Sequence, residues 1–344
     1  MTRVLITGLS RYWGGRLAQI LENAPSVELI VGVDTREPTV ELERTEFVRI
    51  REDYAPLRRI VEAAEIDTIL HTHLIVDSTA TSGGRLHEQN VIGTMNLLAA
   101  AGATDSPVRK VIVKSSTLVY GSGRGDPQIF REQSSRSNTA RTGIERSLIE
   151  VEDYVRDFAE DNPHVVVTLM RCANVIGTDI ETPLMDAIML PAVPDLSGFD
   201  PLVQVVHVDD CASALAFGVE HDLPGIYNVA AEGMVPWSEV RAICAKPGLP
   251  LPPFGSGAAA AVLRAARVVD LPPELMAMLR FGRGVDNKAL QHAGFRYRYT
   301  TVQALRDLLA SMRLKAVVGD SEPAAFYQDD LENFLHRHAL DRST

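Results

Sequence analysis

A glycine-containing loop near the start of the chain carries residue types that bind a phosphorylated ligand. Residues 7–15 (TGLSRYWGG) follow a short apolar run and precede a stretch with helical spacing. Free backbone amides and the positive dipole end at a helix start favour an anion such as a dinucleotide pyrophosphate. The loop residues expected around that anion are Gly8, Ser10, Arg11, Tyr12, Trp13 and Gly14.

An acidic residue ends the next apolar run. Asp34 follows Gly14 by twenty residues and closes residues 27–33. A carboxylate in this place hydrogen-bonds the adenosine ribose hydroxyls and repels a 2′-phosphate, so it favours NAD over NADP. The order of strand, loop, helix, strand and Asp34 therefore predicts an NAD site more strongly than the glycines alone.

Arg11 departs from the usual pattern of such a loop. It stands where a G-x-x-G-x-x-G fingerprint has its middle glycine, which lets the backbone approach the phosphate closely. Two interpretations remain open. Either the Arg11 guanidinium pairs with the pyrophosphate, or the domain has lost its cofactor. The spacing of Gly14 and Asp34 favours cofactor binding.

The elements that would position this loop alternate along the first half of the chain. Strands are predicted at residues 4–6, 27–33, 46–50, 67–71, 111–113 and 165–169. Helices are predicted at residues 12–22, 56–64, 85–101 and 144–159. Strands that are apolar throughout and separated by helices are buried on both faces, which indicates an α/β fold with a doubly wound parallel sheet.

The regular alternation ends after about Arg171. A strand at 204–208, a helix at 212–220 and a strand at 226–229 return to the first domain, which we place at residues 1–175 with 203–230. Residues 176–202 and 231–313 form a smaller C-terminal α+β substrate lobe, with a proline-rich connector at 247–253 and a helix at 258–269. Residues 314–344 form an acidic tail with a helix at 326–336.

Composition limits the partners. The 344 residues carry a formal net charge of −11, which argues against nucleic-acid binding because that needs a basic patch. The apolar run at 258–263 is much shorter than the roughly 20 residues of a membrane helix. Three dispersed cysteines give neither a disulfide framework nor a zinc motif. We expect a cytoplasmic protein with a small-molecule substrate.

Two histidines stand close together in the fourth predicted strand. His71 and His73 share one face of a strand, and Asp77 follows them. A catalytic zinc needs three well-placed ligands, and no further residue has suitable spacing, so no metal site is predicted. His73 could instead act as a local acid or base near neutral pH.

Further motifs follow one another along the chain. They are V-D-T-R at 33–36, Asp53, D-T-I-L-H at 67–71, N-V-I-G-T at 90–94, K-S-S-T-L-V-Y-G at 114–121, R-C-A-N-V-I-G at 171–177 and H-V-D-D at 207–210. With the glycine loop, they resemble the extended short-chain dehydrogenases/reductases, in particular NAD-dependent epimerases and dehydratases such as UDP-glucose 4-epimerases. The resemblance covers about residues 1–310 and implies a Rossmann fold.

The resemblance also implies roles for individual residues. NAD would take a hydride from a sugar carbinol whose oxygen is hydrogen-bonded by Ser116, and Thr117 and Asn174 would contact a nucleotide-sugar. Asn174 could equally stabilise a turn. A homodimer would form through the helices near 85–101 and 144–159. The further cofactor contacts that the resemblance implies are Arg36, Asp53, Tyr54, His71, His73, Asn90 and Ser115.

The Tyr-x-x-x-Lys pair of the family is absent. The residues four positions before the five lysines are Ser106, Lys110, Ala242, Gly284 and Ser311. A phenol with a pKa near 10 is a useful base only beside a cation, so the usual proton relay is missing.

The helix at 144–159 would carry this pair, in one of two registers. One register places Ile144 and Leu148 at the two positions, and the other places Thr142 and Arg146 there. Thr142 could contact substrate and Arg146 could hold the nicotinamide ribose. A purely structural helix is favoured, because no group offers a matched pKa.

Two functions from different classes follow. The first is an NAD-dependent epimerase or dehydratase that acts on a nucleotide-sugar or similar polar alcohol with an altered acid/base set. The alternative is a catalytically silent NAD(H)-binding sensor or partner subunit. The missing pair favours the second, whereas Ser116, Asn90, Asn174 and the loop favour the first.

Overall fold

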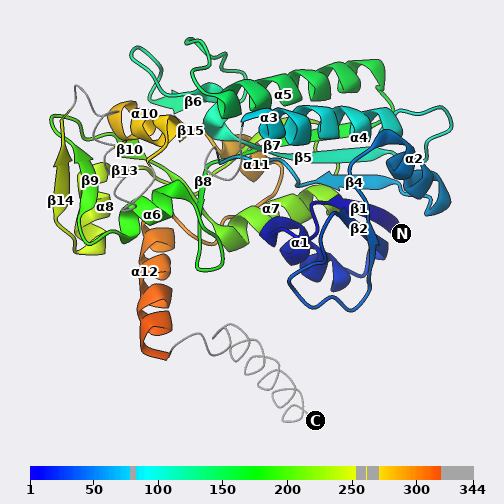
Figure 1. Cartoon of the computed structure of the whole chain (residues 1–344), viewed down its shortest axis with the longest axis horizontal. Helices are drawn as coiled ribbons and strands as arrows, with labels where there is room; N and C mark the ends of the chain where they lie inside the picture. The colour runs from blue at the N-terminus through cyan, green and yellow to red at the C-terminus, as the bar shows by residue number, and fades with distance from the viewer. Residues whose placement is uncertain (78–82, 253–260, 262–270, 319–344) are drawn as a thin grey trace.

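A seven-stranded parallel sheet forms the centre of the computed structural model, which describes residues 1–77, 83–252, 261 and 271–318 (Figure 1). Its strands are β1 (Thr2–Thr7), β2 (Val27–Asp34), β3 (Thr45–Arg49), β4 (Thr68–His71), β5 (Lys110–Ser116), β7 (Val166–Cys172) and β12 (Gly225–Val229). The strand order is β12-β7-β5-β4-β1-β2-β3. The winding direction reverses between β1 and β4, and ligands of such sheets bind at the carboxyl ends of the strands at that point.

Helices cover both faces of the sheet. On one face lie α1 (Tyr12–Glu22) and α7 (Val208–Glu220), which pack against each other. On the other lie α2 (Tyr54–Ala63), α3 (Gly83–His87), the π-helix η1 (Glu88–Ile92), α4 (Gly93–Ala101) and α5 (Gly143–Asp161). The predicted doubly wound α/β fold is confirmed.

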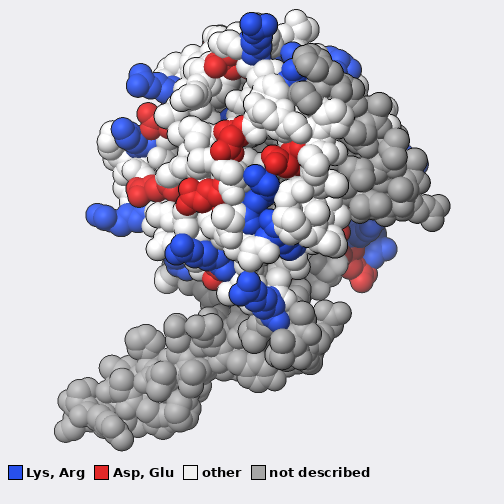
Figure 2. Space-filling view, turned by 90° about the vertical axis from the view of Figure 1, so that its left-hand side faces the viewer, with Lys and Arg blue, Asp and Glu red and all other residues white. Residues whose placement is uncertain are grey.

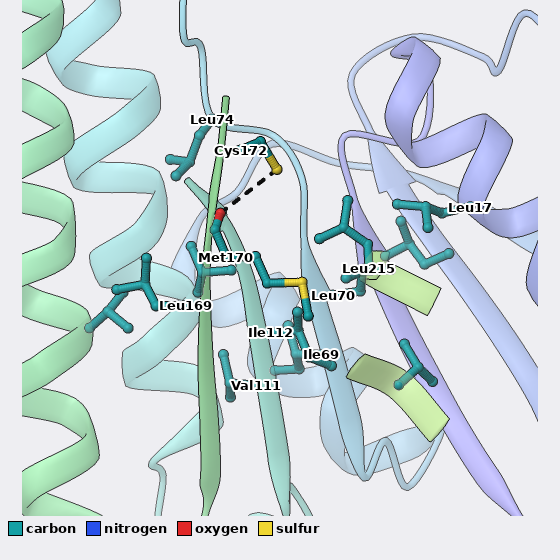
Figure 3. Close-up of a cluster of buried hydrophobic side chains, with 14 of the residues drawn as sticks. Leu17, Ile69, Leu70, Leu74, Val111, Ile112, Leu169, Met170, Cys172 and Leu215 are labelled. Carbon is teal, nitrogen blue, oxygen red and sulfur yellow. Dashed lines mark hydrogen bonds between the residues drawn. The ribbon is translucent and has the colours of Figure 1, made fainter. Parts of the chain in front are cut away.

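The core of this part lies between the sheet and its helices. Ile69 and Leu70 of β4 and Val111 and Ile112 of β5 are fully buried because successive side chains point to opposite faces and both faces are covered (Figure 3). Each such side chain stabilises the fold by about 1.5–3 kcal/mol through burial. This packing fixes the strand ends that carry the candidate site.

A second hydrophobic core gathers around Trp237, which is 1% exposed and donates its indole N–H to the Pro194 carbonyl at 2.7 Å. The elements of the remaining chain include β6 (Ile129–Phe130), β8 (Asn174–Ile176), α6 (Pro183–Met189), β9 (Val193–Leu196), β10 (Leu202–Val203), β11 (Val205–His207), β13 (Val235–Pro236), α8 (Trp237–Cys244) and β14 (Gly248–Leu251). They continue with α10 (Pro273–Phe281), β15 (Gly284–Val285), α11 (Lys288–His292) and α12 (Thr301–Val318).

The structure differs from the sequence-based expectation at β14 and at the start of α7. Residues 248–251 form strand β14, paired in parallel with β9, instead of a connector. Proline is tolerated there because the sheet has two strands and each of them is an edge. Helix α7 begins at Val208 with His207 as its cap, since the His207 ring accepts the Asp209 N–H at 3.2 Å.

Other expectations fall outside the structural description. The helices predicted at 258–269 and 326–336 lie outside the described residues, apart from residue 261. None of the described helices is long and apolar enough to cross a lipid bilayer. On the face shown in Figure 2, basic and acidic side chains of the described residues are interspersed.

Candidate active site

The glycine loop joins β1 to α1 at the point where the strand order reverses. Gly8 adopts a φ of +76°, which disfavours any side chain. A Cβ on Gly14 would lie 2.3 Å from the Gly8 carbonyl oxygen, so only glycine permits this close turn. Arg11 is the N-cap of α1 and makes no side-chain capping bond. The amides of the first helical turn are therefore left for an external anion.

Asp34 anchors the loop to the end of β2. Its carboxylate accepts the Ser10 N–H at 3.0 Å, the Ser10 hydroxyl at 2.6 Å and the Thr35 N–H at 2.6 Å. Burial opposes ionisation, but these hydrogen bonds and the charge of His73 hold the pKa of Asp34 below its usual range. Asp34 and Ser10 are both predicted cofactor contacts, and the structure brings them together. The ionised Asp34 carboxylate is the hydrogen-bond acceptor, and Ser10 is the donor.

A buried charge cluster lies beside the loop. His73 Nδ1 is 2.6 Å from Glu52 Oε1, and both side chains are nearly inaccessible. Burial opposes ionisation of Glu52, but the adjacent His73 lowers the pKa of that carboxyl. Arg11 faces Glu52 and Asp34, and burial lowers the pKa of its guanidinium. A side chain on Gly8 would meet the His73 backbone at 3.0 Å, so this cluster directly adjoins the loop.

Glu52 was missed by the sequence analysis, which selected Asp53 and Tyr54. Asp53 is the N-cap of α2 and is exposed, and Tyr54 begins that helix and is 37% exposed. Arg36 is also exposed. In the sequence, Glu52 is marked only as the residue before the N-cap of a helix. That position does not predict whether its side chain points toward the loop or toward solvent.

His71 lies in the sheet core and is held from both sides. Its Nδ1 is 2.7 Å from the Thr7 hydroxyl, and its Nε2 is 3.0 Å from the Thr94 hydroxyl. Thr94 donates its own proton to the Asn90 carbonyl, so Nε2 of His71 is the donor toward Thr94. Burial lowers the pKa of His71 to about 4. This supports a structural role for His71.

The neutral His71 predicts a pH-dependent stability. The unfolded chain binds a proton at His71 below a pH of about 6.5, whereas the folded protein does not bind one until about pH 4. The His71 contribution is complete above pH 6.5 and falls by about 2 kcal/mol between pH 6.5 and 5. When the free energy of unfolding is measured with urea at several pH values, His71→Asn should lack this part of the decrease between pH 6.5 and 5. The exposed His164→Asn variant should keep it, and equal slopes for all three proteins would contradict this assignment.

Asn90 and Ser115 are engaged within the protein. Asn90 accepts the Ile75 N–H and donates to the Ile75 carbonyl, both at 2.8 Å, which fixes the segment after β4. Ser115 donates to Glu152 Oε1 at 2.6 Å. Both predicted cofactor contacts therefore hold neighbouring segments of the protein in place through their side chains.

One of the two registers for the missing proton relay is apolar, and the other is polar. Ile144 and Leu148 on α5 are both 0% exposed and belong to the core. Thr142 caps α5 in a reciprocal capping box with Glu145, and Arg146 is exposed. Ser116 is partly exposed at the end of β5, where its hydroxyl accepts the Leu118 N–H at 3.2 Å and caps the short 3-10 helix η2 (Thr117–Tyr120).

Two arginines that the sequence analysis left without a role lie around Glu145. Arg136 donates to the Leu118 carbonyl at 3.3 Å and pairs with Glu145 at 2.9 Å. Arg283, which precedes β15, is buried and faces Glu145, and burial lowers the pKa of its guanidinium to about 10. Its Nε is buried and has no hydrogen-bond partner among the described residues.

Lys114 adds a buried cation at the end of β5. It is 3% exposed, and its ammonium lies 4.7 Å from the centre of the Trp13 ring. Thr117 is buried, and Asn174 lies 2.9 Å from the Met278 sulfur of α10. Among the described residues no group of three or more histidine, cysteine or acidic side chains could hold a metal ion.

The reversal point, the uncapped helix and the acidic end of β2 are features of the Rossmann fold class. The chain belongs to the NAD dependent epimerase/dehydratase family, whose model matches residues 4–230. This confirms the family resemblance inferred from the motifs.

Curated relatives share most of the chain. The uncharacterized protein Rv0501 of Mycobacterium tuberculosis is 31% identical over 323 residues, which cover 92% of this chain and 85% of that protein. The uncharacterized protein Mb0513 of Mycobacterium bovis matches with the same values. The names of these relatives carry no assigned activity.

Solved structures share the fold. UDP-glucuronic acid 4-epimerase from Bacillus cereus, in complex with NAD, is 15% identical with a TM-score of 0.68 over 91% of this chain and 99% of that chain. UDP-glucose 4-epimerase from Thermotoga maritima, with UDP-glucose, is 17% identical with a TM-score of 0.67 over 92% and 100%. WbmH from Bordetella bronchiseptica, with NAD+, is 21% identical with a TM-score of 0.66 over 91% and 99%.

Proposed function

We propose that this protein binds NAD at the reversal point and acts on a nucleotide-sugar or similar polar alcohol with an altered acid/base set. The observation that carries the proposal is the amino end of α1, which no side chain caps. Gly8 and Gly14 form the close turn in front of this helix end, and Asp34 is hydrogen-bonded to the same loop. Solved relatives of the same fold are described with NAD or with UDP-glucose, which supports both ligand classes.

The residues present fit this cofactor. A side chain on Gly14 would fill the turn that the pyrophosphate approaches, and no acidic residue lies in the first turn of α1 to repel it. Arg11 would add a positive charge beside the pyrophosphate, and the Asp34 carboxylate would accept hydrogen bonds from the adenosine ribose hydroxyls. The bound nicotinamide would supply the hydride acceptor. Ser116 would hydrogen-bond the reacting oxygen.

A second candidate function is a silent NAD(H)-binding sensor or partner subunit. The observation that favours it is the complete burial of Ile144 and Leu148, which puts two apolar core residues at the relay positions in one of the two registers. Thr142 and Arg146 stay predictions for a replaced relay.

Ser116→Ala distinguishes the two functions. If the chain is an enzyme, loss of the hydroxyl should reduce turnover of UDP-glucose or UDP-glucuronic acid about 100-fold, since one hydrogen bond to a developing charge is removed. NAD affinity should stay within about twofold, because Ser116 is placed at the substrate side. Turnover at equal rates in both proteins would contradict the role of Ser116. No turnover in the wild type, with intact NAD binding, would establish the silent alternative for these substrates.

A further inference from the structure

Two cysteines that are far apart in the sequence come into contact beside the crevice. Cys172 is the last residue of β7, and Cys211 lies in the first turns of α7. Their sulfur atoms are 3.2 Å apart, and the residues are 2% and 0% exposed. The third cysteine, Cys244, belongs to the other hydrophobic core. The fold therefore brings Cys172 and Cys211 into contact and keeps Cys244 apart from them.

The two thiols have different surroundings. Cys211 donates its S–H to the Cys172 sulfur, and this bond lowers the pKa of Cys172 together with the Lys114 charge, while burial opposes them. Burial raises the pKa of Cys211. The other neighbour of the Cys172 sulfur is the Met170 carbonyl at 3.9 Å (Figure 3). Cys172 is thus the better nucleophile, and Cys211 is placed to react with it.

We propose that Cys172 and Cys211 form a dithiol that a hydroperoxide converts to an intramolecular disulfide. The Cys172 thiolate attacks one peroxide oxygen, so an S–O bond forms, the O–O bond breaks and hydroxide leaves to take up the thiol proton as water. The Cys211 sulfur then attacks the sulfenic sulfur, the S–O bond breaks, and a second water leaves. Two electrons pass from the two sulfurs to the peroxide.

The short separation of the two sulfur atoms favours the bond. A disulfide needs a sulfur separation of about 2.05 Å, so the sulfurs must approach by only about 1.2 Å. β7 and α7 already pack against each other, and α7 also packs against α1. Buried cysteines without a partner behave as inert small apolar residues. Here the direct contact and the neighbouring Lys114 cation distinguish this pair, and hydrogen peroxide is nearly as small as water.

The test counts thiols in the folded, full-length protein. The reduced protein is treated with hydrogen peroxide, quenched, unfolded and alkylated with iodoacetamide before mass spectrometry. The reduced sample should take up three labels, one for each cysteine. The oxidised sample should take up one label, at Cys244, be about 2 Da lighter before alkylation, and yield a peptide that links Cys172 to Cys211.

Two variants complete the test. Cys244→Ser should form the link as the wild type does, because that residue lies in the other core. Cys211→Ser should stop at the sulfenic acid of Cys172, which dimedone would capture. Three free thiols in the folded wild type after peroxide would overturn the proposal, as would a link through Cys244. These readouts need no cofactor, so they can fail or succeed independently of NAD binding.

Discussion

Replacement of Arg171 by leucine is expected to lower the free energy of unfolding by about 3–5 kcal/mol, because it leaves a buried carboxylate without its cation. Arg171 Nε lies 3.0 and 3.1 Å from the two oxygens of Glu152, and its Nη1 donates to the Tyr120 hydroxyl at 2.8 Å. Arg171 and Glu152 are 6% and 2% exposed, so water cannot replace the lost bonds. This network joins the ends of β5 and β7 to α5 beside the crevice.

Urea unfolding at pH 7 measures this effect against a matched control. Arg156→Leu removes an arginine from a pair with Asp153 whose side chains are 53% and 55% exposed, and it should cost less than about 1 kcal/mol. The double variant Glu152→Met/Arg171→Leu should recover part of the loss, since no unpaired charge remains. A single Arg171→Leu variant as stable as the Arg156→Leu control would contradict the account of this network.

Gly14→Ala is expected to weaken NAD binding at least 100-fold. The new methyl group would lie 2.3 Å from the Gly8 carbonyl oxygen and 2.6 Å from the Leu9 Cα, so loop backbone must shift. The shift displaces the amides that would hold the pyrophosphate, and a misplacement of about 1 Å can cost two orders of magnitude. Some stability should be lost as well.

Gly84→Ala is the matched control, because Gly84 lies in α3 and has no atom within 4 Å of its built Cβ. It should leave NAD affinity unchanged and slightly stabilise the helix. Calorimetric titration with NAD, after circular dichroism has shown both variants to be folded, makes the comparison. Equal affinities for the wild type and Gly14→Ala would show that NAD does not use this loop.

The alternating elements were predictable because the strands are apolar on both faces. The helix expected at 12–22 is α1, Tyr12–Glu22, and the helix expected at 144–159 lies within α5, Gly143–Asp161. Strand β14 was not predictable, since Pro250 interrupts its pattern and its partner among the described strands is β9. The π-helical turn of η1 was also missed, because hydrophobic spacing does not distinguish it from an α-helix.

The candidate site was predictable where a local pattern carries it. Gly8, Gly14 and Asp34 meet as the strand–loop–helix order requires. Glu52 and Arg283 were missed because their burial depends on segments distant in the sequence: Glu52 meets His73, and Arg283 faces Glu145. Burial against a distant segment leaves no periodic signal in the chain.

The measurement that tests the central claim most directly is calorimetric titration of the purified protein with NAD, NADH and NADP, with Trp13 fluorescence as a local reporter. Selective binding of NAD or NADH, with a Trp13 signal, is the predicted result, because Asp34 repels a 2′-phosphate and Trp13 lies in the first turn of α1. No binding at millimolar cofactor would contradict it. Arg11, Glu52 and His73 would then close the crevice, and the chain would keep the fold of its family without the cofactor.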